Sequence, residues 1–489
     1  MQLRSLLEGL ELQALQGDLS VEIDNIVYDS RKARPGSLFV CITGFVTDGH
    51  KYITQALNQG VSAILAERQV PELAGIWAVT PNTRRGLAHV SDRFFNHPSG
   101  KLDLIGFTGT KGKTTATYMT RAILLAAGRC PGLIGTIANI LGDRIIYASR
   151  TTPESFDLQA LLDEMVENKV DSCVMEVSSQ GLMLDRVYGC SYKIGVFTNL
   201  YTDHIGPHEH ANMEDYLQAK LLLFSRCEQA VINRDLEIFD RVKAAAAGPV
   251  TTYGLSAASD VRAVDLEKIN EADRIGTRFR LESPFYQGSV FVGMPGLFNV
   301  YNALAAITCA GLLGLPFAAV QQGLADITVP GRVQPIPTGS DFQVIVDYAH
   351  NSASLESLLV TLREYVKGRL IVLFGNGGDR ARSRRFEMGE TAGRLADLSI
   401  ITSDNPRTED PLKIIEDIIT GITPTGGQYK VVPDRREAIE TAINLAGPGD
   451  LIVIAGKGHE NYQIFADRTI HFDDAETAAE LLAQRGSGG

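Results

Sequence analysis

The chain has 489 residues, of which 44% are hydrophobic and 21% are charged, and its net charge is −12. This length is too great for one compact core and predicts about two to four domains. The negative charge argues against a general role at nucleic acids or membrane surfaces, so an anionic substrate must be held by local basic groups. No apolar run is long enough to span a bilayer, and the first residues do not form a signal peptide. The six scattered cysteines are typical of reduced thiols, and we expect a cytoplasmic protein.

Residues 1–98 are expected to form a small α/β domain. Apolar and polar residues alternate over residues 21–42, a helix is expected at residues 50–60, and a strand follows at residues 61–67. The turn-forming segment at residues 97–100 marks the first domain boundary.

Residues 99–335 are expected to form a central domain and residues 336–489 a C-terminal domain, with a Pro- and Gly-rich linker at residues 329–340. In both domains, nearly continuous apolar strands alternate with helices, which is typical of a parallel, doubly wound sheet. The strands are expected at residues 102–110, 172–179, 193–200, 229–235, 343–350, 369–378, 398–406 and 450–460. The expected fold class is therefore α/β with three domains: a small N-terminal α/β domain, a central P-loop domain with a doubly wound sheet, and a Rossmann-like C-terminal domain. Ligands bind such sheets where the strands end, so the polar residues after the last four strands are expected to share one site.

The strongest motif is GTKGKTT, Gly109–Thr115, between an apolar strand and a helix. Phosphate binding requires glycines that let the backbone approach, N–H groups that point inward and a lysine over the phosphates. Lys113 fits the lysine role, and the Thr114 hydroxyl fits a Mg²⁺ ligand. Phe107 stands where the full P-loop has glycine, so this is a shortened loop. The alternative is a chance Gly-Lys-Thr turn, but the strand–loop–helix context favours ATP binding.

Acidic and histidine residues follow two further strands. Glu176 ends one strand, and Asp203 and His204 follow the next. A carboxylate at a strand end facing a P-loop is placed to bind a nucleotide-bound Mg²⁺, although a helix-capping or solvated acid is the alternative for Glu176. His204, His208 and His210 have no cysteine or fourth ligand at standard spacing, so we reject a zinc site.

These motifs closely resemble those of the Mur ligases, and the resemblance covers essentially the whole chain. The shared motifs in chain order are DSR, GTKGKTT, MEVSS, TNLYTDH, MPGLFNVYNALAA, PGR, DYAH, SDNPR and GKGHE. Within the family, the best match is to the members that add the third residue of the stem peptide. The resemblance implies an ATP-dependent ligase that joins an amino acid to UDP-N-acetylmuramoyl-L-alanyl-D-glutamate in peptidoglycan synthesis.

The resemblance also implies four groups of site residues. Those implied to bind ATP are Gly109, Thr110, Lys111, Gly112, Lys113, Thr114, Thr115, Asn299, Asn302, Arg332 and Asp347. Those implied to bind the UDP-linked substrate are Ser30, Thr43, Gly44, Phe45, Asp48, Gly49 and His50 at the uridine, and Thr151, Thr152, Ser178 and Arg186 at the muramyl dipeptide. Those implied to bind the amino acid are Arg385, Asp404, Asn405, Pro406, Arg407, Gly456 and Glu460. The implied Mg²⁺ ligands are Thr114, Glu176, His204 and a carbamylated Lys220, and the implied catalytic residues are Lys113, Lys220, Glu176 and His204.

Lys220 shows how much the resemblance adds to the residue pattern. From the pattern alone, Lys220 is a solvated lysine on an amphipathic helix. The resemblance implies that Lys220 is carbamylated, which would replace an ammonium with an anionic oxygen ligand for a second Mg²⁺. This chemistry requires a partly neutral amine, so we expect burial to lower the lysine pKa.

The implied reaction has two steps. The D-glutamyl carboxylate attacks the γ-phosphate of ATP to give an acyl phosphate and ADP, and the incoming amine then attacks the acyl carbon and expels phosphate. Both steps bring anions together, so metal ions and lysines must neutralise the developing charge. No nucleophilic side chain is required.

The motif SDNPR predicts which amino acid is added. In the family this motif accompanies meso-diaminopimelate, whose distal carboxylate a guanidinium such as that of Arg407 can bind bidentately, and Glu460 is implied to pair with the distal amine. From pattern alone, Arg407 is a solvent-facing turn residue. The chain departs from the family pattern at Ser352 and Phe386, where proline is usual, and at Ala381, where an acid is usual. A lysine-adding ligase therefore remains an alternative.

Two further alternatives are a folylpolyglutamate synthetase of the same superfamily and a binding protein of the same fold that has lost turnover. The intact set of Lys113, Thr114, Glu176, His204 and Lys220 argues against the second. We expect a monomer that acts on neither nucleic acid nor membrane.

Overall fold

The computed structural model describes residues 1–45, 47–68, 75–207, 209–271 and 274–487. The chain forms two compact units, one made of Met1–Val261 with Leu304–Pro316 and the other of Arg262–Ala303 with Phe317–Gly489. The expected domain boundaries at 98/99 and 335/336 fall inside the first and second unit, respectively, and they remain predictions.

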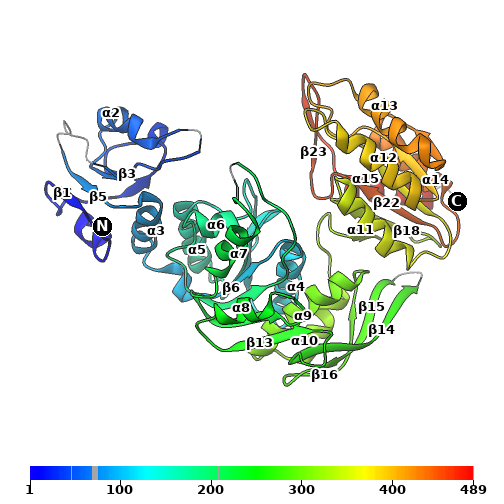
Figure 1. The fold of residues 1–489 in the computed structure, drawn as a ribbon, viewed down its shortest axis with the longest axis horizontal. Helices are drawn as coiled ribbons and strands as arrows, with labels where there is room; N and C mark the ends of the chain where they lie inside the picture. Colours follow the sequence, from blue (N-terminus) through cyan, green and yellow to red (C-terminus); the bar gives the residue numbers. More distant parts are fainter. Residues whose placement is uncertain (46, 69–74, 208, 272–273, 488–489) are drawn as a thin grey trace. The chain divides into compact units, whose positions relative to one another are not determined.

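The first unit begins with a small sheet and its helices (Figure 1). The strands lie in the order β1 (Ala14–Gln16), β5 (Trp77–Val79), β4 (Ala63–Ala66), β3 (Ser37–Val40) and β2 (Asn25–Val27). All neighbours pair in parallel except β1 and β5. The helices are α1 (Leu3–Leu7), α2 (Ile53–Asn58) and α3 (Thr83–Phe94). The Asn82 side chain caps α3 at the amide of Arg85, and the buried Leu87 and Val90 of α3 join the core of the sheet.

The rest of the first unit is a larger sheet with β6 near its middle. The strands lie in the order β13 (Val250–Gly254), β12 (Cys227–Asn233), β11 (Tyr192–Phe197), β6 (Asp103–Thr108), β10 (Ser172–Glu176), β7 (Pro131–Ile134), β8 (Ala138–Leu141) and β9 (Arg144–Tyr147). The pairs from β13 to β7 are parallel, and β7, β8 and β9 pair antiparallel. The helices are α4 (Lys113–Ala126), α5 (Ser155–Glu167), α6 (Ser179–Met183), α7 (Met213–Leu221) and α8 (Phe239–Ala244). Glu176 is in register with Phe107, and Phe197 with Thr108, so the carboxyl ends of β6, β10 and β11 share one edge.

The second unit contains antiparallel strands and a further, mainly parallel sheet. The antiparallel strands are β14 (Val261–Glu271), β15 (Arg274–Glu282) and β16 (Gln287–Val292), followed by α9 (Leu297–Leu312), which begins in this unit, and α10 (Phe317–Ala325). The parallel sheet has the order β17 (Gln334–Ile336), β18 (Gln343–Asp347), β22 (Leu451–Ala455), β19 (Leu370–Phe374), β20 (Leu398–Ile401) and β21 (Tyr429–Val431). Its remaining elements are α11 (Ser352–Arg363), α12 (Ser383–Leu395), α13 (Pro411–Ile422), α14 (Arg435–Leu445), α15 (Asp474–Ser487) and the hairpin of β23 (Tyr462–Ile464) and β24 (Thr469–His471).

These elements confirm the expected α/β fold class and its parallel sheets. The expected linker at residues 329–340 differs, because β17 lies within it and pairs antiparallel with β18. Pro335 is tolerated because β17 is an edge strand, where one face of the backbone needs no partner.

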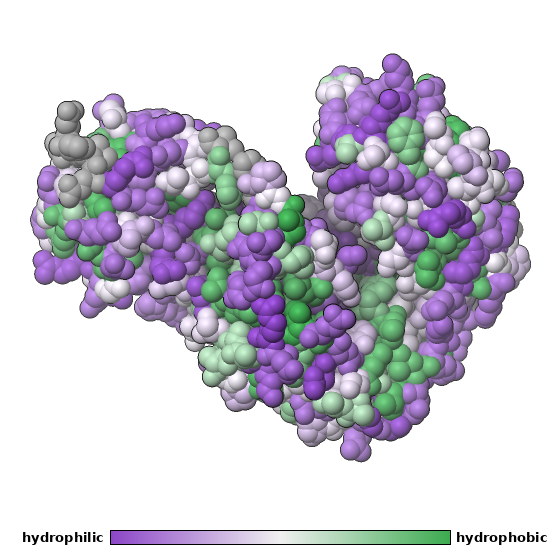
Figure 2. Space-filling view, viewed as in Figure 1, coloured by the Kyte–Doolittle hydropathy of each residue, from purple (hydrophilic) through white to green (hydrophobic). Residues whose placement is uncertain are grey.

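The surface agrees with the composition of the chain. Figure 2 shows mainly hydrophilic residues on the visible face, with hydrophobic residues in separate groups. Every helix in the described part of the chain is too short or too polar to cross a membrane.

Candidate active site

The P-loop motif forms the connection between β6 and α4. Gly109 and Gly112 have φ of 143° and 83°, conformations that side chains disfavour. A Cβ at Gly109 would lie 2.0 Å from Thr198 Oγ1, so the loop requires glycine there. Lys113 begins α4, and its Nζ donates to the carbonyls of Gly109 at 2.8 Å and Thr110 at 3.1 Å. The lysine therefore lies over its own loop, as phosphate binding requires.

The other side of this loop is fixed to the residues that follow β11. The amide of Lys111 donates to Asn199 Oδ1 at 2.8 Å, and the Thr198 hydroxyl donates to the Lys111 carbonyl at 2.8 Å. Thr110 Oγ1 accepts hydrogen bonds from the Tyr201 amide at 3.0 Å and from the Tyr216 hydroxyl at 3.2 Å. The loop is thus held in shape by the residues that follow β11 and by Tyr216 of α7.

Glu176 connects the P-loop to the next strand of the sheet. Its carboxylate is 1% exposed and accepts from the Thr114 hydroxyl at 2.9 Å. The amide and hydroxyl of Thr136 also donate to it, at 2.8 Å and 3.1 Å. The sequence interpretation missed Thr136, although a short apolar run, residues 131–134, ends just before it at the same sheet edge. The predicted metal ligands Thr114 and Glu176 are therefore neighbours.

The predicted muramyl-dipeptide residues adjoin Glu176. Thr151 Oγ1 lies 3.0 Å from Thr136 Oγ1, and the Thr152 hydroxyl donates to the Glu176 carbonyl at 3.0 Å. Thr152 in turn accepts from the Ser178 amide at 3.0 Å and, through its carbonyl, from Arg186 Nη1 at 3.1 Å. One hydrogen-bonded network thus joins the P-loop to all four predicted dipeptide residues.

Lys220 is buried beside the P-loop. Its side chain lies on α7, is 1% exposed and donates to the Gly109 carbonyl at 2.9 Å. Its Nζ is 4.1 Å from the centre of the Tyr216 ring. Burial, together with the nearby charge of Lys113, lowers the pKa of Lys220 to about 6. The expected depressed pKa is confirmed.

His204 is placed differently from the other predicted catalytic residues. It is half exposed, has φ of 56°, and its Nδ1 lies 2.9 Å from Glu209 Oε1. Its ring centre is 5.8 Å from that of Tyr216, the same ring that Lys220 Nζ approaches. In the described part of the chain no three His, Cys, Asp or Glu side chains cluster as a metal site, and His208 lies outside it.

The predicted uridine residues lie around the ends of β2 and β3. His50 Nδ1 is 2.7 Å from Asp48 Oδ1, and His50 Nε2 accepts from the Glu67 amide at 3.0 Å. Because Nε2 accepts, the ring hydrogen is on Nδ1 and is donated to Asp48. Burial raises the pKa of Asp48, but hydrogen bonds from Arg68 and His50 outweigh it and hold the pKa below its usual range.

The other predicted uridine residues are close by in the chain. Ser30 Oγ donates to Gln55 Oε1 at 3.1 Å, and Thr43 Oγ1 donates to Glu67 Oε2 at 3.2 Å. The amides of Gly44 and Gly49 are used in a tight turn, and Phe45 is exposed. Glu67 thus links two predicted uridine residues, because its carboxylate accepts from Thr43 and its amide donates to His50.

The remaining predicted nucleotide residues lie in the second unit. Asn302 Nδ2 donates to Asn299 Oδ1 at 3.2 Å, and Asn299 Nδ2 donates to the Pro295 carbonyl at 2.8 Å. The Arg332 guanidinium lies 4.9 Å from the centre of the Tyr348 ring. Burial raises the pKa of Asp347 in spite of Arg332, and both carboxylate oxygens accept backbone amides, from Val333 and Ala349 at 2.8 Å each.

The predicted amino-acid residues after β20 and β22 are brought together. Asn405 Nδ2 donates to Glu460 Oε2 at 2.9 Å, and Asn405 Oδ1 accepts from the Ile464 amide at 3.0 Å. Gly456 has φ of 112°, and a Cβ there would lie 2.8 Å from Asp404 Oδ2. The structure favours glycine at position 456 because the backbone has this positive φ and because the Asp404 carboxylate occupies the space where a Cβ would lie.

Arg407 and Arg385 differ in how their guanidinium groups are used. Arg407 Nη1 donates to the Gly378 carbonyl at 2.9 Å. Arg385 is buried and forms ion pairs with Glu409 at 2.7 Å and Asp417 at 3.1 Å. The sequence interpretation did not foresee these two acidic partners of Arg385.

A partly buried histidine beside this cluster predicts how the free energy of unfolding depends on pH. Burial, aided by the charge of Arg332, lowers the pKa of His459 to about 4, whereas an unfolded histidine titrates near ~6.5. Between these values the unfolded chain binds more protons, so the free energy of unfolding rises with pH over this window. We expect His459→Phe to flatten that rise in urea unfolding measured from about pH 4.5 to 7.

The exposed His471 provides the matched control, because its ring pairs with Glu476 at the surface. The hydrogen bond with Glu476 raises the pKa of His471, so its own contribution to stability falls as pH rises, and His471→Phe should not flatten the rise between about pH 4.5 and 7. An unchanged slope in His459→Phe would contradict the assignment of a partly buried, neutral histidine at position 459.

The fold and the P-loop define an α/β protein of the nucleoside-triphosphate-binding class. Three family descriptions match the chain: "Mur ligase family, catalytic domain" over residues 22–83, "Mur ligase middle domain" over residues 107–310 and "Mur ligase, glutamate ligase domain" over residues 331–458.

The chain is 44% identical to a UDP-N-acetylmuramoyl-L-alanyl-D-glutamate--2,6-diaminopimelate ligase of Caldanaerobacter subterraneus subsp. tengcongensis, over 99% of both chains. A solved structure of a ligase with this name is similar at a TM-score of 0.75 and 30% identity, over 99% of each chain. Folylpolyglutamate synthase of Mycobacterium tuberculosis shares the fold, with a TM-score of 0.59 and 18% identity over 83% of this chain and 95% of that chain. The chain belongs to the Mur ligase family.

Proposed function

We propose that the chain is an ATP-dependent, ADP-forming ligase that adds meso-2,6-diaminopimelate to UDP-N-acetylmuramoyl-L-alanyl-D-glutamate in peptidoglycan synthesis. The observation that carries this proposal is the network from Thr114 through Glu176 to Thr151 and Thr152. It connects a phosphate-binding loop to the predicted dipeptide site through a few hydrogen bonds. The relative at 44% identity, whose name describes this reaction, supports the same function.

The side chains at the P-loop fit a magnesium ion. Mg²⁺ prefers oxygen ligands, and Thr114 and Glu176 present a hydroxyl and a carboxylate 2.9 Å apart. His204 is the third proposed ligand. When bound, Mg²⁺ would neutralise charge on the phosphates during transfer.

In the first step a D-glutamyl carboxylate oxygen attacks the γ-phosphorus of ATP, the bond to the β–γ bridging oxygen breaks, and ADP leaves the acyl phosphate. Backbone amides of the loop and the Lys113 ammonium orient the phosphates and balance their charge. Thr151, Thr152 and Arg186 hold the dipeptide so that its carboxylate reaches the γ-phosphate. In the second step, the amine of the incoming amino acid attacks the acyl carbon of the acyl phosphate, forms the new amide bond and expels phosphate.

Lys220 is proposed to act as a carbamate. Its amine is buried and, with a pKa near 6, is largely neutral at pH 7. A neutral amine attacks CO₂, forming a bond from Nζ to carbon and releasing one proton. The resulting anion would supply an oxygen ligand for a second Mg²⁺.

Diaminopimelate is the proposed amino acid because of the residues around Arg407. The guanidinium would bind the distal carboxylate, and Glu460 would pair with the distal amine. Asn405, whose Nδ2 donates to Glu460 Oε2 at 2.9 Å, would bind the amino acid beside Glu460. Arg385, paired with Glu409 and Asp417, and the loop residues Asp404, Pro406 and Gly456 would shape this site. Lysine is the alternative substrate.

The assay that tests the function is ADP release. With ATP, Mg²⁺ and UDP-N-acetylmuramoyl-L-alanyl-D-glutamate present, we expect meso-diaminopimelate to support release at least about tenfold faster than L-lysine, because lysine lacks the carboxylate that a guanidinium binds. Faster release with lysine would assign the lysine-adding reaction. Release with a folate and glutamate, and none with the UDP-linked dipeptide, would overturn the proposal.

The remaining features of the proposal concern the whole molecule. We propose three domains with boundaries at 98/99 and 335/336, a monomeric state, a cytoplasmic location and no role for nucleic acid or membrane. Asn299, Asn302, Arg332 and Asp347 are proposed to contact ATP, and the seven residues from Ser30 to His50 to contact uridine.

A further inference from the structure

Three arginine side chains surround one buried carboxylate in the first unit. Glu154, the residue before α5, has a side chain that is 6% exposed. Its Oε2 lies 3.3 Å from Arg84 Nη1, 3.4 Å from Arg186 Nε and 3.9 Å from Arg150 Nη1. Arg84 comes from α3 and Arg186 from the segment after α6, so segments far apart in the sequence meet at a single oxygen atom.

The single carboxylate of Glu154 does not balance the charges of the three arginines, so the cluster has excess positive charge. The side chains of Arg84 and Arg186 are 18% and 11% exposed, so water screens their charges poorly. Burial lowers the pKa of Arg186, and the charges of Arg150 and Arg84 lower it further, against the attraction of Glu154. Among the described residues, Arg186 Nε makes no hydrogen bond.

Asp157, which lines the same cavity as Glu154, and Asp185, which precedes Arg186 in the chain, have other partners. Asp157 accepts a hydrogen bond from the Tyr28 hydroxyl at 2.5 Å. Asp185 lies 3.6 Å from Arg85 and 3.7 Å from Arg226. Among the described residues, the three arginines form ion pairs with Glu154 alone, so an anionic ligand would balance the remaining positive charge.

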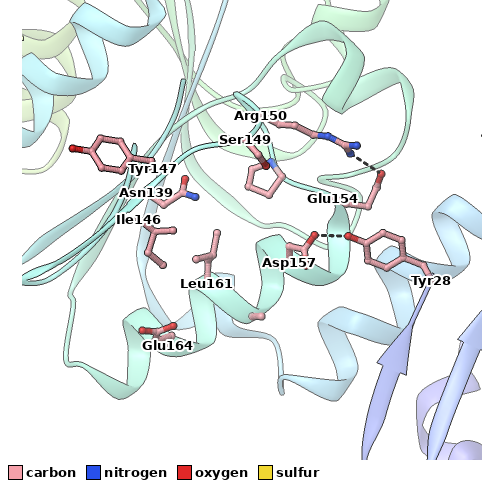
Figure 3. Close-up of a pocket in the computed structure, with 12 residues that line it drawn as sticks. Tyr28, Asn139, Ile146, Tyr147, Ser149, Arg150, Glu154, Asp157, Leu161 and Glu164 are labelled. Atoms are coloured by element: carbon pink, nitrogen blue, oxygen red, sulfur yellow. Dashed lines mark hydrogen bonds and ion pairs between the residues drawn. The ribbon is translucent and has the colours of Figure 1, made fainter. Parts of the chain in front are cut away.

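The cluster adjoins both an open cavity and the predicted dipeptide residues. Arg150 and Glu154 line a cavity of about 430 Å³, with Tyr28 and Asp157 at the same end and Tyr147 further along (Figure 3). Arg186 Nη1 donates to the carbonyl of Thr152, which is proposed to bind the muramyl dipeptide. A ligand group at the cluster would thus lie next to that substrate.

We infer that Arg84 and Arg150 complete, with Arg186 and Glu154, an anion-binding site that holds a carboxylate or phosphate group of the UDP-linked substrate. This inference rests on the proposed function and adds Arg84 and Arg150 to the proposed site. Guanidinium groups bind both anions with paired N–H donors, and Glu154 holds the guanidinium groups of Arg84 and Arg186 in place. The site also meets the need for local positive charge in a chain of net charge −12.

The test compares neighbouring arginines of α3. Calorimetric titration with UDP-N-acetylmuramoyl-L-alanyl-D-glutamate, without ATP, should show about tenfold or greater weakening in Arg84→Ala and partial recovery in Arg84→Lys. Arg85 is the control, because its side chain is half exposed, pairs with Asp185 and lies 4.7 Å from the Tyr188 ring. Arg85→Ala should bind within about twofold of the parent, and the melting temperatures report whether Arg84→Ala is folded.

Titrations with UDP alone and with N-acetylmuramoyl-L-alanyl-D-glutamate distinguish the two anions. Weaker UDP binding in Arg84→Ala would assign a phosphate, and weaker binding of the UDP-free sugar dipeptide would assign a carboxylate. Parent-like binding by Arg84→Ala, or an equal loss in Arg85→Ala, would overturn the inference while the proposed function stands. A parent protein that neither binds the UDP-linked dipeptide nor releases ADP with it would instead overturn the proposed function.

Discussion

Replacement of Lys220 by alanine is expected to lower kcat by about 100-fold or more, because it removes the proposed carbamate, whose oxygen would hold a second Mg²⁺ beside the developing phosphate charge. The side chain is 1% exposed and lies against the P-loop at the Gly109 carbonyl. ADP release measured under saturating substrates gives the change in kcat. Small carboxylates such as acetate should restore part of the rate, because they supply the anionic oxygen that the carbamate is proposed to provide.

The control for Lys220 lies on the same helix. Gln218 is exposed on α7 and hydrogen-bonds to Glu214 at 2.8 Å, so Gln218→Ala should keep the parent kcat. Incubation of the parent with ¹³C-bicarbonate should give a carbamate carbon signal that is strong at pH 8 and falls below about pH 6, where the amine becomes protonated. Full activity in Lys220→Ala would exclude the catalytic role.

The parts of the site that the sequence predicted are those defined by short stretches of chain. The P-loop requires glycine at positions where the backbone has positive φ or meets Thr198, and such demands leave a local signature. A lysine and a threonine at the start of α4 complete that signature. The ends of strands can also be predicted from the sequence, because each apolar run stops where polar residues begin, as at Glu176.

The parts that could not be predicted depend on which segments meet in space. Thr136 reaches Glu176 because β7 lies beside β10, a neighbour relation that the order of strands in the sequence does not give. Arg84 and Glu154 are 70 residues apart, and nothing in either local pattern pairs them. The burial of Lys220 likewise depends on segments that meet in space. The pattern of α7 alone indicates a solvated lysine, and it is the P-loop that covers the side chain.

Arg385 shows the same limit for charged residues. Its place in the family motif implied contact with the amino acid, but the pattern did not reveal that Glu409 and Asp417 take both ends of its guanidinium. Those partners belong to the loop before α13 and to α13 itself, which packs against α12. Arg407, whose guanidinium donates to the carbonyls of Gly378 and Asn405, is the arginine proposed to recognise the distal carboxylate.

Arg407→Ala is therefore expected to raise the KM for meso-diaminopimelate about 10- to 100-fold, since a hydrogen bond to a charged group contributes about 1.5–3 kcal/mol. The KM for ATP should stay within about twofold of the parent value. The substitution adds little backbone strain, because both arginine and alanine have a Cβ at the φ of 53° found there. The backbone amide also keeps its bond to the Ile464 carbonyl at 3.0 Å.

Two further variants separate charge from geometry at Arg407. Arg407→Lys keeps the charge but loses the planar pair of donors, so its KM should lie between those of the parent and the alanine variant. Arg436, half exposed and paired with Glu480 on α15, is the control, and Arg436→Ala should keep the parent KM. The ratio of the kcat/KM for diaminopimelate to that for lysine should fall in Arg407→Ala. Lysine has no distal carboxylate, so its binding does not depend on the Arg407 guanidinium. Equal KM values for diaminopimelate in parent and Arg407→Ala would remove Arg407 from amino-acid selection and leave the Asn405–Glu460 pair to account for it.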